Sequence, residues 1–77
     1  MKLYLLRRFN RKPKYDVVNG FVIAAESPIK ARRLASKNAG DEGSNIWTDT
    51  MKSSCKVIAE NSKIKEEKIV LKDFNAG

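Results

Sequence analysis

The dipeptide Ser27-Pro28 fixes the start of the main helix in this chain. A serine side chain caps the first free N–H groups of a helix, and proline at the first helical position has its φ angle preset and no N–H to leave unsatisfied. Helix-forming residues continue from Ile29 to about Asn38, and Gly40 is placed to end the helix. The residues before Ser27 favour strands, so the sequence predicts a β-rich segment followed by one helix.

The predicted helix carries an apolar face and a basic face. Small and apolar side chains recur at helical spacing on the first face, which suits close packing on a sheet. These residues are Ala31, Leu34, Ala35 and Asn38. The cations of the helix are Lys30, Arg33 and Lys37 on the outer face, with Arg32 between the two faces. Such a basic face either binds phosphate or carboxylate groups or is only solvated, and we keep both interpretations.

Residues 2–9 form the first predicted strand, because leucine and tyrosine dominate there. The two faces of this strand carry Leu3 with Leu5 and Tyr4 with Leu6. A polar loop follows over residues 10–14, where Pro13 interrupts regular pairing.

Residues 15–25 are rich in strand formers around Asn19-Gly20, a pair that is typical of a tight turn. Two alternatives follow. Residues 15–18 and 21–24 form a very short hairpin, or residues 21–25 form the strand and pair with residues 2–9. We favour the second alternative, because four-residue arms alone are weak.

The second half of the chain is predicted to contribute two more strands, after a segment over residues 40–54 that is mostly loop. Residues 55–60 and 69–74 form these strands, joined by a charged connection. The inward side chains are expected to be Cys55, Val57 and Ala59, then Ile69 and Leu71. The order β-β-α-β-β predicts an α+β fold, a small antiparallel sheet with one helix packed across one face.

The length of 77 residues predicts a single domain, residues 1–77, with a marginal core. Because the chain has one cysteine and no histidine, we expect neither an internal disulfide nor a zinc cluster to stabilise this core. The longest apolar run, residues 21–25, is too short to span a membrane, and a lone cysteine suits a reducing cytoplasm. We therefore expect a cytoplasmic protein without cofactors.

The positive charge of the chain lies in its first half. Residues 1–37 hold ten Lys/Arg and two acids, a net of +8, whereas residues 38–77 hold six lysines and seven acids, a net of −1. The strand and loop before the helix contribute Arg7, Arg8, Arg11, Lys12 and Lys14. Arg7 and Arg8 point to opposite faces of a strand, so only one of them can join the loop cations. Together with the helix, these residues predict a basic face that attracts acidic partners.

No motif indicates catalysis, a metal site or a nucleic-acid module. Histidine, the usual general base near neutral pH, is absent, and Cys55 lies on the inward face of a predicted strand. The spacing of the acids fits no calcium-binding loop. Zinc-finger spacing, RNP-like aromatic pairs and a helix-turn-helix pattern are missing as well. We expect no enzyme and no metal, and any affinity for nucleic acid would be non-specific.

Two aromatic residues are possible anchors for a partner, because exposed aromatic rings are favoured at interfaces. They are Trp47, inside a polar loop, and Tyr15. The alternative for Trp47 is that its ring folds back and caps the core, which a chain of this length favours.

Two resemblances extend these expectations. The segments GDEG and IW, the Cys-containing strand and the terminal LKDFNAG resemble small proteins carried by phages and prophages, a group that implies no activity. Residues 23–38, IAAESPIKARRLASKN, are similar to the strand–helix unit of a small anti-CRISPR protein acting on the type I-F surveillance complex. That resemblance implies a non-enzymatic protein that occupies the DNA-binding surface of the complex. It implies as contact candidates Lys30, Arg32, Arg33 and Lys37.

We therefore expect a small phage-type protein that acts in the cytoplasm of a bacterial host. It would bind stoichiometrically, through its basic face, to a protein or nucleoprotein complex of host defence. The alternative is a mostly non-specific nucleic-acid-binding domain. The sequence leaves the partner and the oligomeric state open.

Overall fold

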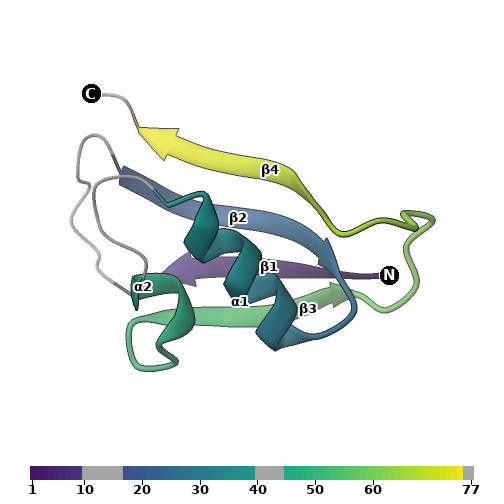
Figure 1. Ribbon diagram of the computed structural model, residues 1–77, viewed down its shortest axis with the longest axis horizontal. Coiled ribbons are helices and arrows are strands. Elements are labelled where there is room, and N and C mark those ends of the chain that lie inside the picture. Colours follow the sequence, from purple (N-terminus) through teal and green to yellow (C-terminus); the bar gives the residue numbers. More distant parts are fainter. Residues whose placement is uncertain (10–16, 40–44, 76–77) are drawn as a thin grey trace.

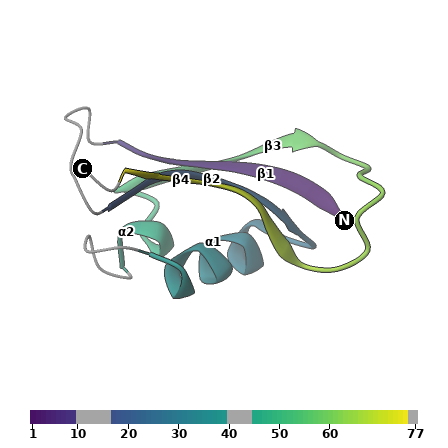
Figure 2. The same cartoon turned by 90° about the horizontal axis from the view of Figure 1, so that it is seen from above.

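The computed structural model describes residues 1–9, 17–39 and 45–75. Four antiparallel strands form one sheet in the order β3-β1-β2-β4, and two helices lie on the same face of it (Figure 1, Figure 2). The elements are β1 (Lys2–Arg8), β2 (Val17–Ala25), α1 (Pro28–Lys37), α2 (Asn45–Thr48), β3 (Ser53–Ala59) and β4 (Lys68–Asn75). The predicted α+β fold is confirmed. The short helix α2 is an addition, since the sequence placed it in a loop.

β1 is a central strand, paired with β2 on one side and with β3 on the other. The side chains of β1 divide between the two faces of the sheet as their alternation in the sequence predicts. Tyr4 and Leu6 are buried on the helix side, whereas Leu3 and Leu5 lie on the other face and stay partly exposed. We call this second face, which carries Leu3, Leu5 and their cross-strand neighbours, the open face, because neither helix covers it (Figure 2).

β2 runs through Asn19-Gly20 without a turn, so the hairpin alternative is wrong and pairing with the first strand is confirmed. The strand also starts earlier than predicted, at Val17. Between Val18 and Gly20 the register against β4 shifts, with Asn19 as the extra residue of a bulge. The bulge explains why Val18 and Phe21 both reach the core although they are three positions apart.

β4 contains a second bulge, which overturns the predicted facing of Leu71. Ile69 pairs with Ile23 and packs against the core, as expected. Leu71 pairs with Val22, because Val70 is an extra residue between the two. Leu71 therefore lies on the open face, where it is 60% exposed. Residues two apart share a face only where the strand is regular.

β3 begins two residues before the predicted strand. Cys55 and Val57 pack against the core as expected, and Ser53 joins the interior as a fully buried residue. A register shift at Ile58 pairs Ala59 with Leu3 of the open face. Ala59 therefore does not extend the inward row that the sequence predicted.

α1 begins where Ser27-Pro28 predicts. The Ser27 backbone is extended, and its hydroxyl accepts a 3.2 Å hydrogen bond from the N–H of Lys30. At the other end, the side chain of Asn38 donates a 2.9 Å hydrogen bond to the Leu34 carbonyl. The buried side chains of α1 are Ala31 and Ala35, with Leu34 packed partly against the core, so the predicted inner face is confirmed for these three residues.

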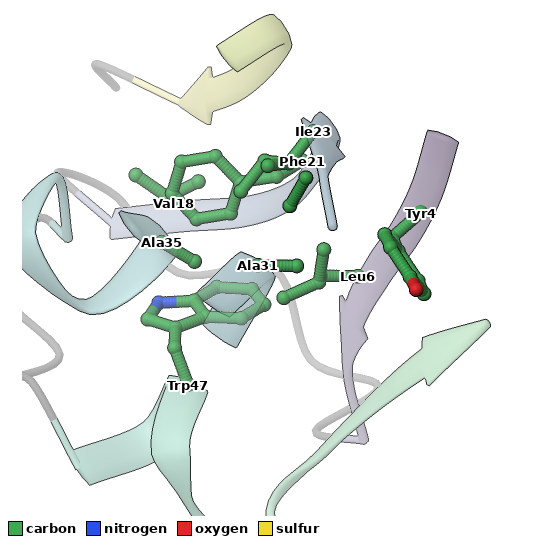
Figure 3. Packing of buried hydrophobic residues seen from close by; sticks show 9 residues of the cluster. Tyr4, Leu6, Val18, Phe21, Ile23, Ala31, Ala35 and Trp47 are labelled. Atoms are coloured by element: carbon green, nitrogen blue, oxygen red, sulfur yellow. The ribbon is translucent and has the colours of Figure 1, made fainter. Parts of the chain in front are cut away.

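Trp47 of α2 is the largest side chain of the core. Its ring meets Phe21 edge-on, with ring centroids 5.0 Å apart and planes at 84° (Figure 3). The possible role of Trp47 as an exposed anchor is wrong, because its ring is 0% exposed. Among the fully buried side chains that the structure describes, this ring removes the most apolar surface from water, which stabilises a small core. The short helix α2 places this ring in the core.

Candidate basic binding surface

Several residues of the predicted basic face lie outside the described part of the chain. They are Arg11, Lys12 and Lys14, together with the possible anchor Tyr15. The remaining cations come from β1 and α1, and the structure does not gather them into one patch.

Arg7 and Arg8 lie on opposite faces of the sheet, as neighbours in a strand must. Arg7 is exposed on the open face, where it pairs with Gly20 of β2. Arg8 lies on the helix side and is partly exposed, and its Nε and Nη1 atoms are buried without a hydrogen-bond partner. Because α1 packs on the face that Arg7 does not occupy, Arg7 cannot form one patch with the helix cations.

Arg32 points inward, toward the junction of α2 and β3. Its Nη1 donates to the Ser53 hydroxyl at 2.9 Å and to the Trp47 carbonyl at 3.2 Å, and its Nη2 donates to the Ser53 carbonyl at 3.0 Å. The Ser53 hydroxyl has one proton, which it donates to the Ile46 carbonyl at 2.7 Å. These bonds tie α1 to α2 and to the start of β3. The guanidinium is therefore engaged in hydrogen bonds that hold α1 against α2 and β3, and we call this arrangement the Arg32 clamp.

Sequence reasoning missed this clamp, although one signal pointed to it. Arg32 lies between the two helix faces and directly follows the buried Ala31. A long basic side chain at such a position can pack its aliphatic part on the apolar surface while its charged group reaches a polar partner beyond that surface. Its acceptors, however, come from Trp47 and Ser53, which are 15 and 21 residues away. No local pattern identifies such partners.

The other three helix cations converge on one hollow of about 200 Å³. Lys30, Arg33 and Lys37 line it together with Leu34 of the same helix and Glu67, which precedes β4. Spacings of three and four residues place the cations along one side of α1, and all three are exposed. The hollow therefore lies between α1 and the segment that leads into β4.

An exposed apolar side chain adjoins these cations. Ile29 is 67% exposed and lies four residues before Arg33, so both face the same side of α1. We call Ile29, Lys30, Arg33 and Lys37 the basic helix surface. Two acids moderate its charge: Glu67 across the hollow, and Glu26, whose carboxylate lies 3.1 Å from the Lys30 ammonium. That exposed ion pair is weak, so Lys30 can exchange it for a partner's carboxylate.

The chemistry available on the described residues is that of contact. Burial raises the pKa of the Cys55 thiol, and the positive charge of Arg32 offsets this only in part, so the thiol stays protonated near neutral pH. The part of the chain that the structure describes holds no group of three or more His, Cys, Asp or Glu placed to bind a metal ion. None of its helices is long and apolar enough to cross a membrane.

Comparison with protein-family models finds no match, and comparisons with curated proteins and with solved structures find none either. Function is therefore argued from the surface itself.

Proposed function

We propose that this chain is a small, non-enzymatic binding protein that attaches stoichiometrically to an acidic protein surface through its basic helix surface. The observation that supports this most is the position of Ile29, exposed one turn before Arg33 and two turns before Lys37 on the same side of α1. Apolar contact adds affinity at the centre of a protein interface, while surrounding cations select an acidic partner and speed its approach. The half-buried Leu34 extends the apolar area into the hollow.

Direct binding of nucleic acid is the alternative. Surfaces that bind single strands combine cations with aromatic rings on which bases stack, and α1 contains no aromatic residue. Arg32 is withdrawn from the helix cations by its bonds to Ser53, and Glu67 faces those that remain. Three cations would release few counterions from a phosphate backbone, so a protein partner is the better match.

The partner we propose is a protein or nucleoprotein complex of bacterial host defence. This rests on the resemblance of residues 23–38 to the strand–helix unit of an anti-CRISPR protein, which includes Lys30, Arg33 and Lys37. A phage-type protein acting in the host cytoplasm would then contact an acidic region on a protein subunit of that complex. Inhibition would follow from occupation of its surface, with no chemical step.

Titration of the purified type I-F surveillance complex tests the proposal directly. Native mass spectrometry is expected to show a fixed stoichiometry for the wild type. Ile29→Asp and Arg33→Glu/Lys37→Glu are each expected to weaken binding about tenfold or more. Lys52→Glu/Lys63→Glu is the matched control, because it reverses two exposed charges outside α1 and should bind like wild type.

The same variants distinguish the alternative. In one outcome, the wild type does not bind the complex but binds a mixed-sequence DNA duplex with an affinity that falls steeply as the salt concentration rises. If Ile29→Asp also leaves that binding unchanged, the nucleic-acid alternative replaces the proposal. Binding to neither probe would refute the defence complex as the partner.

A further inference from the structure

The strand register places three cross-strand rows of residues on the open face, of which Gly20 and Ala24 are buried and the others are at least partly exposed. From β3 to β4 the rows are Ser54, Arg7, Gly20 and Asp73; Lys56, Leu5, Val22 and Leu71; and Ala59, Leu3, Ala24 and Lys68. Both helices lie on the opposite side of the sheet (Figure 2). The rows therefore face away from α1 and α2.

The middle row is an apolar strip across three neighbouring strands. Leu5 pairs with Val22, and Val22 pairs with Leu71, which is 60% exposed. Val70, the extra residue next to Leu71 in β4, is a further 47% exposed. Contiguous exposed apolar surface marks an interaction site, since its burial contributes about 25 cal/mol per Å².

A hollow of about 220 Å³ lies beside this strip. Gly20 has no side chain, so the space between Arg7 and Asp73 stays unfilled, and Leu5 and Leu71 line the same hollow. Arg7 and Asp73 are two strands apart, about 10 Å. The structure gives neither side chain an ion pair with another described residue. A cation and a carboxylate thus lie on opposite sides of the hollow, neither in an ion pair with a residue of the described ranges.

We infer that a second copy of this chain packs on the open face, with a two-fold axis along β2. Such an axis exchanges the strands on either side of β2, so β1 of one copy lies over β4 of the other. Arg7 then faces Asp73 of the second copy, and Leu5 faces Leu71 of the second copy, each twice by symmetry. Val22 lies near the axis and meets its own counterpart. The first two rows are therefore self-complementary, whereas the third row places Leu3 of one copy over Lys68 of the other.

The dimensions of the face suit this arrangement. Stacked sheets lie about 10 Å apart and cross at about 30°, which displaces side chains one strand from the axis by roughly 2–3 Å, within reach of an arginine. The molecule measures 33 by 23 Å in the plane of Figure 1, a footprint of about 760 Å², and a standard interface buries roughly 800 Å² on each partner. In the proposed arrangement β1, β2 and β4 of each copy overlap and β3 lies beyond the overlap, so the buried area is smaller than the full footprint.

The inference is independent of the proposed function, because it uses the other side of the sheet. In the dimer, α1 of each copy stays on the outside. Association must also overcome the repulsion between two chains that each carry a net charge of +7. The reciprocal Arg7–Asp73 pairs and the apolar strip are the contacts that oppose this repulsion.

Charge reversal tests the pairing through its reciprocity. Arg7→Asp places two carboxylates in each facing pair and Asp73→Arg places two guanidiniums, so each variant alone is expected to be monomeric where wild type is dimeric. An equimolar mixture of the two variants restores opposite charges at both pairs and is expected to dimerise. Sedimentation velocity over a concentration series measures the mass, and far-UV circular dichroism verifies that each variant is folded.

Lys56→Glu is the matched control, because it reverses one charge on the same face in the neighbouring strand β3. The two-fold axis leaves β3 of each copy beyond the edge of the other sheet, so this variant is expected to dimerise like wild type. A wild type that stays monomeric would overturn the inference. A dimer unaffected by Arg7→Asp, a mixture that fails to dimerise, or loss of the dimer in Lys56→Glu would overturn it as well.

Discussion

The guanidinium of Arg32 in α1 donates a 2.9 Å hydrogen bond to the hydroxyl of Ser53 at the start of β3. Ser53 is fully buried and donates in turn to the Ile46 carbonyl of α2. Two residues thus join α1 to α2 and β3, which come later in the sequence. This relationship separates Arg32 from its neighbour Arg33, although the sequence offered both as contact candidates.

Arg32→Ala is expected to lower the free energy of unfolding by about 1–3 kcal/mol, because it leaves the Ser53 hydroxyl and buried carbonyls without their donor. Arg33→Ala, at an exposed site on the same helix, is expected to change it little. Urea denaturation followed by the fluorescence of Trp47, the only tryptophan, measures both. Equal losses in the two variants would contradict the clamp.

Trp47 is expected to emit at short wavelength and to be quenched slowly by acrylamide, because its ring is fully buried against Phe21. Phe21→Ala is expected to lower the free energy of unfolding by about 3–5 kcal/mol, since it removes the ring that Trp47 contacts. Phe21→Leu keeps more of the volume and should cost less. Emission like that of free tryptophan in the wild type would place the ring in solvent instead.

Gly20→Ala is expected to destabilise the sheet by about 1–3 kcal/mol, because a Cβ atom at this position would lie 3.0 Å from the Leu6 carbonyl oxygen. The obstructing atom is backbone, so it cannot rotate away. Asn19→Ala, at the partly exposed extra residue of the same bulge, serves as the control and should be milder. Thermal unfolding compares the two, and an unchanged midpoint for Gly20→Ala would contradict the close approach.

Cys55 is expected to react slowly with a thiol reagent near neutral pH, because burial raises the pKa of its thiol. The folded protein holds this proton more tightly than the unfolded chain does. The stability that follows is complete below the unfolded pKa and is lost as the pH rises through the raised, folded pKa. Cys55→Ala should remove this part of the alkaline loss of stability, as urea midpoints at increasing pH would show. Identical alkaline profiles would contradict it.

The features that the sequence predicts correctly are those with local causes. Ser27-Pro28 starts α1 where expected, because a cap and a preset φ angle act within one turn. The alternation of Tyr4 and Leu6 with Leu3 and Leu5 likewise assigns the faces of β1, because a regular strand has a period of two.

The features that the sequence misses depend on residues far away in the chain. Asn19 is a bulge and not a turn because β2 continues through it, with residues 17–24 paired to β4 and residues 20–25 paired to β1. Val70 shifts the facing of Leu71 in the same way, and only the register against β2 reveals it. The predicted basic face is not a single patch for a related reason. Arg32 donates to acceptors in α2 and β3, and the residue pattern of the helix alone does not identify these partners.

The strand order has a consequence for synthesis of the chain. β1 and β2 form the centre of the sheet, yet both outer neighbours, β3 and β4, come from the second half of the sequence. As the chain leaves the ribosome, the central pair can form while both of its edges still expose unpaired backbone groups. This interval is when a nascent chain is most open to chaperones and to misassociation. The interval ends when residues 53–75 have emerged and β3 and β4 have paired with the central strands.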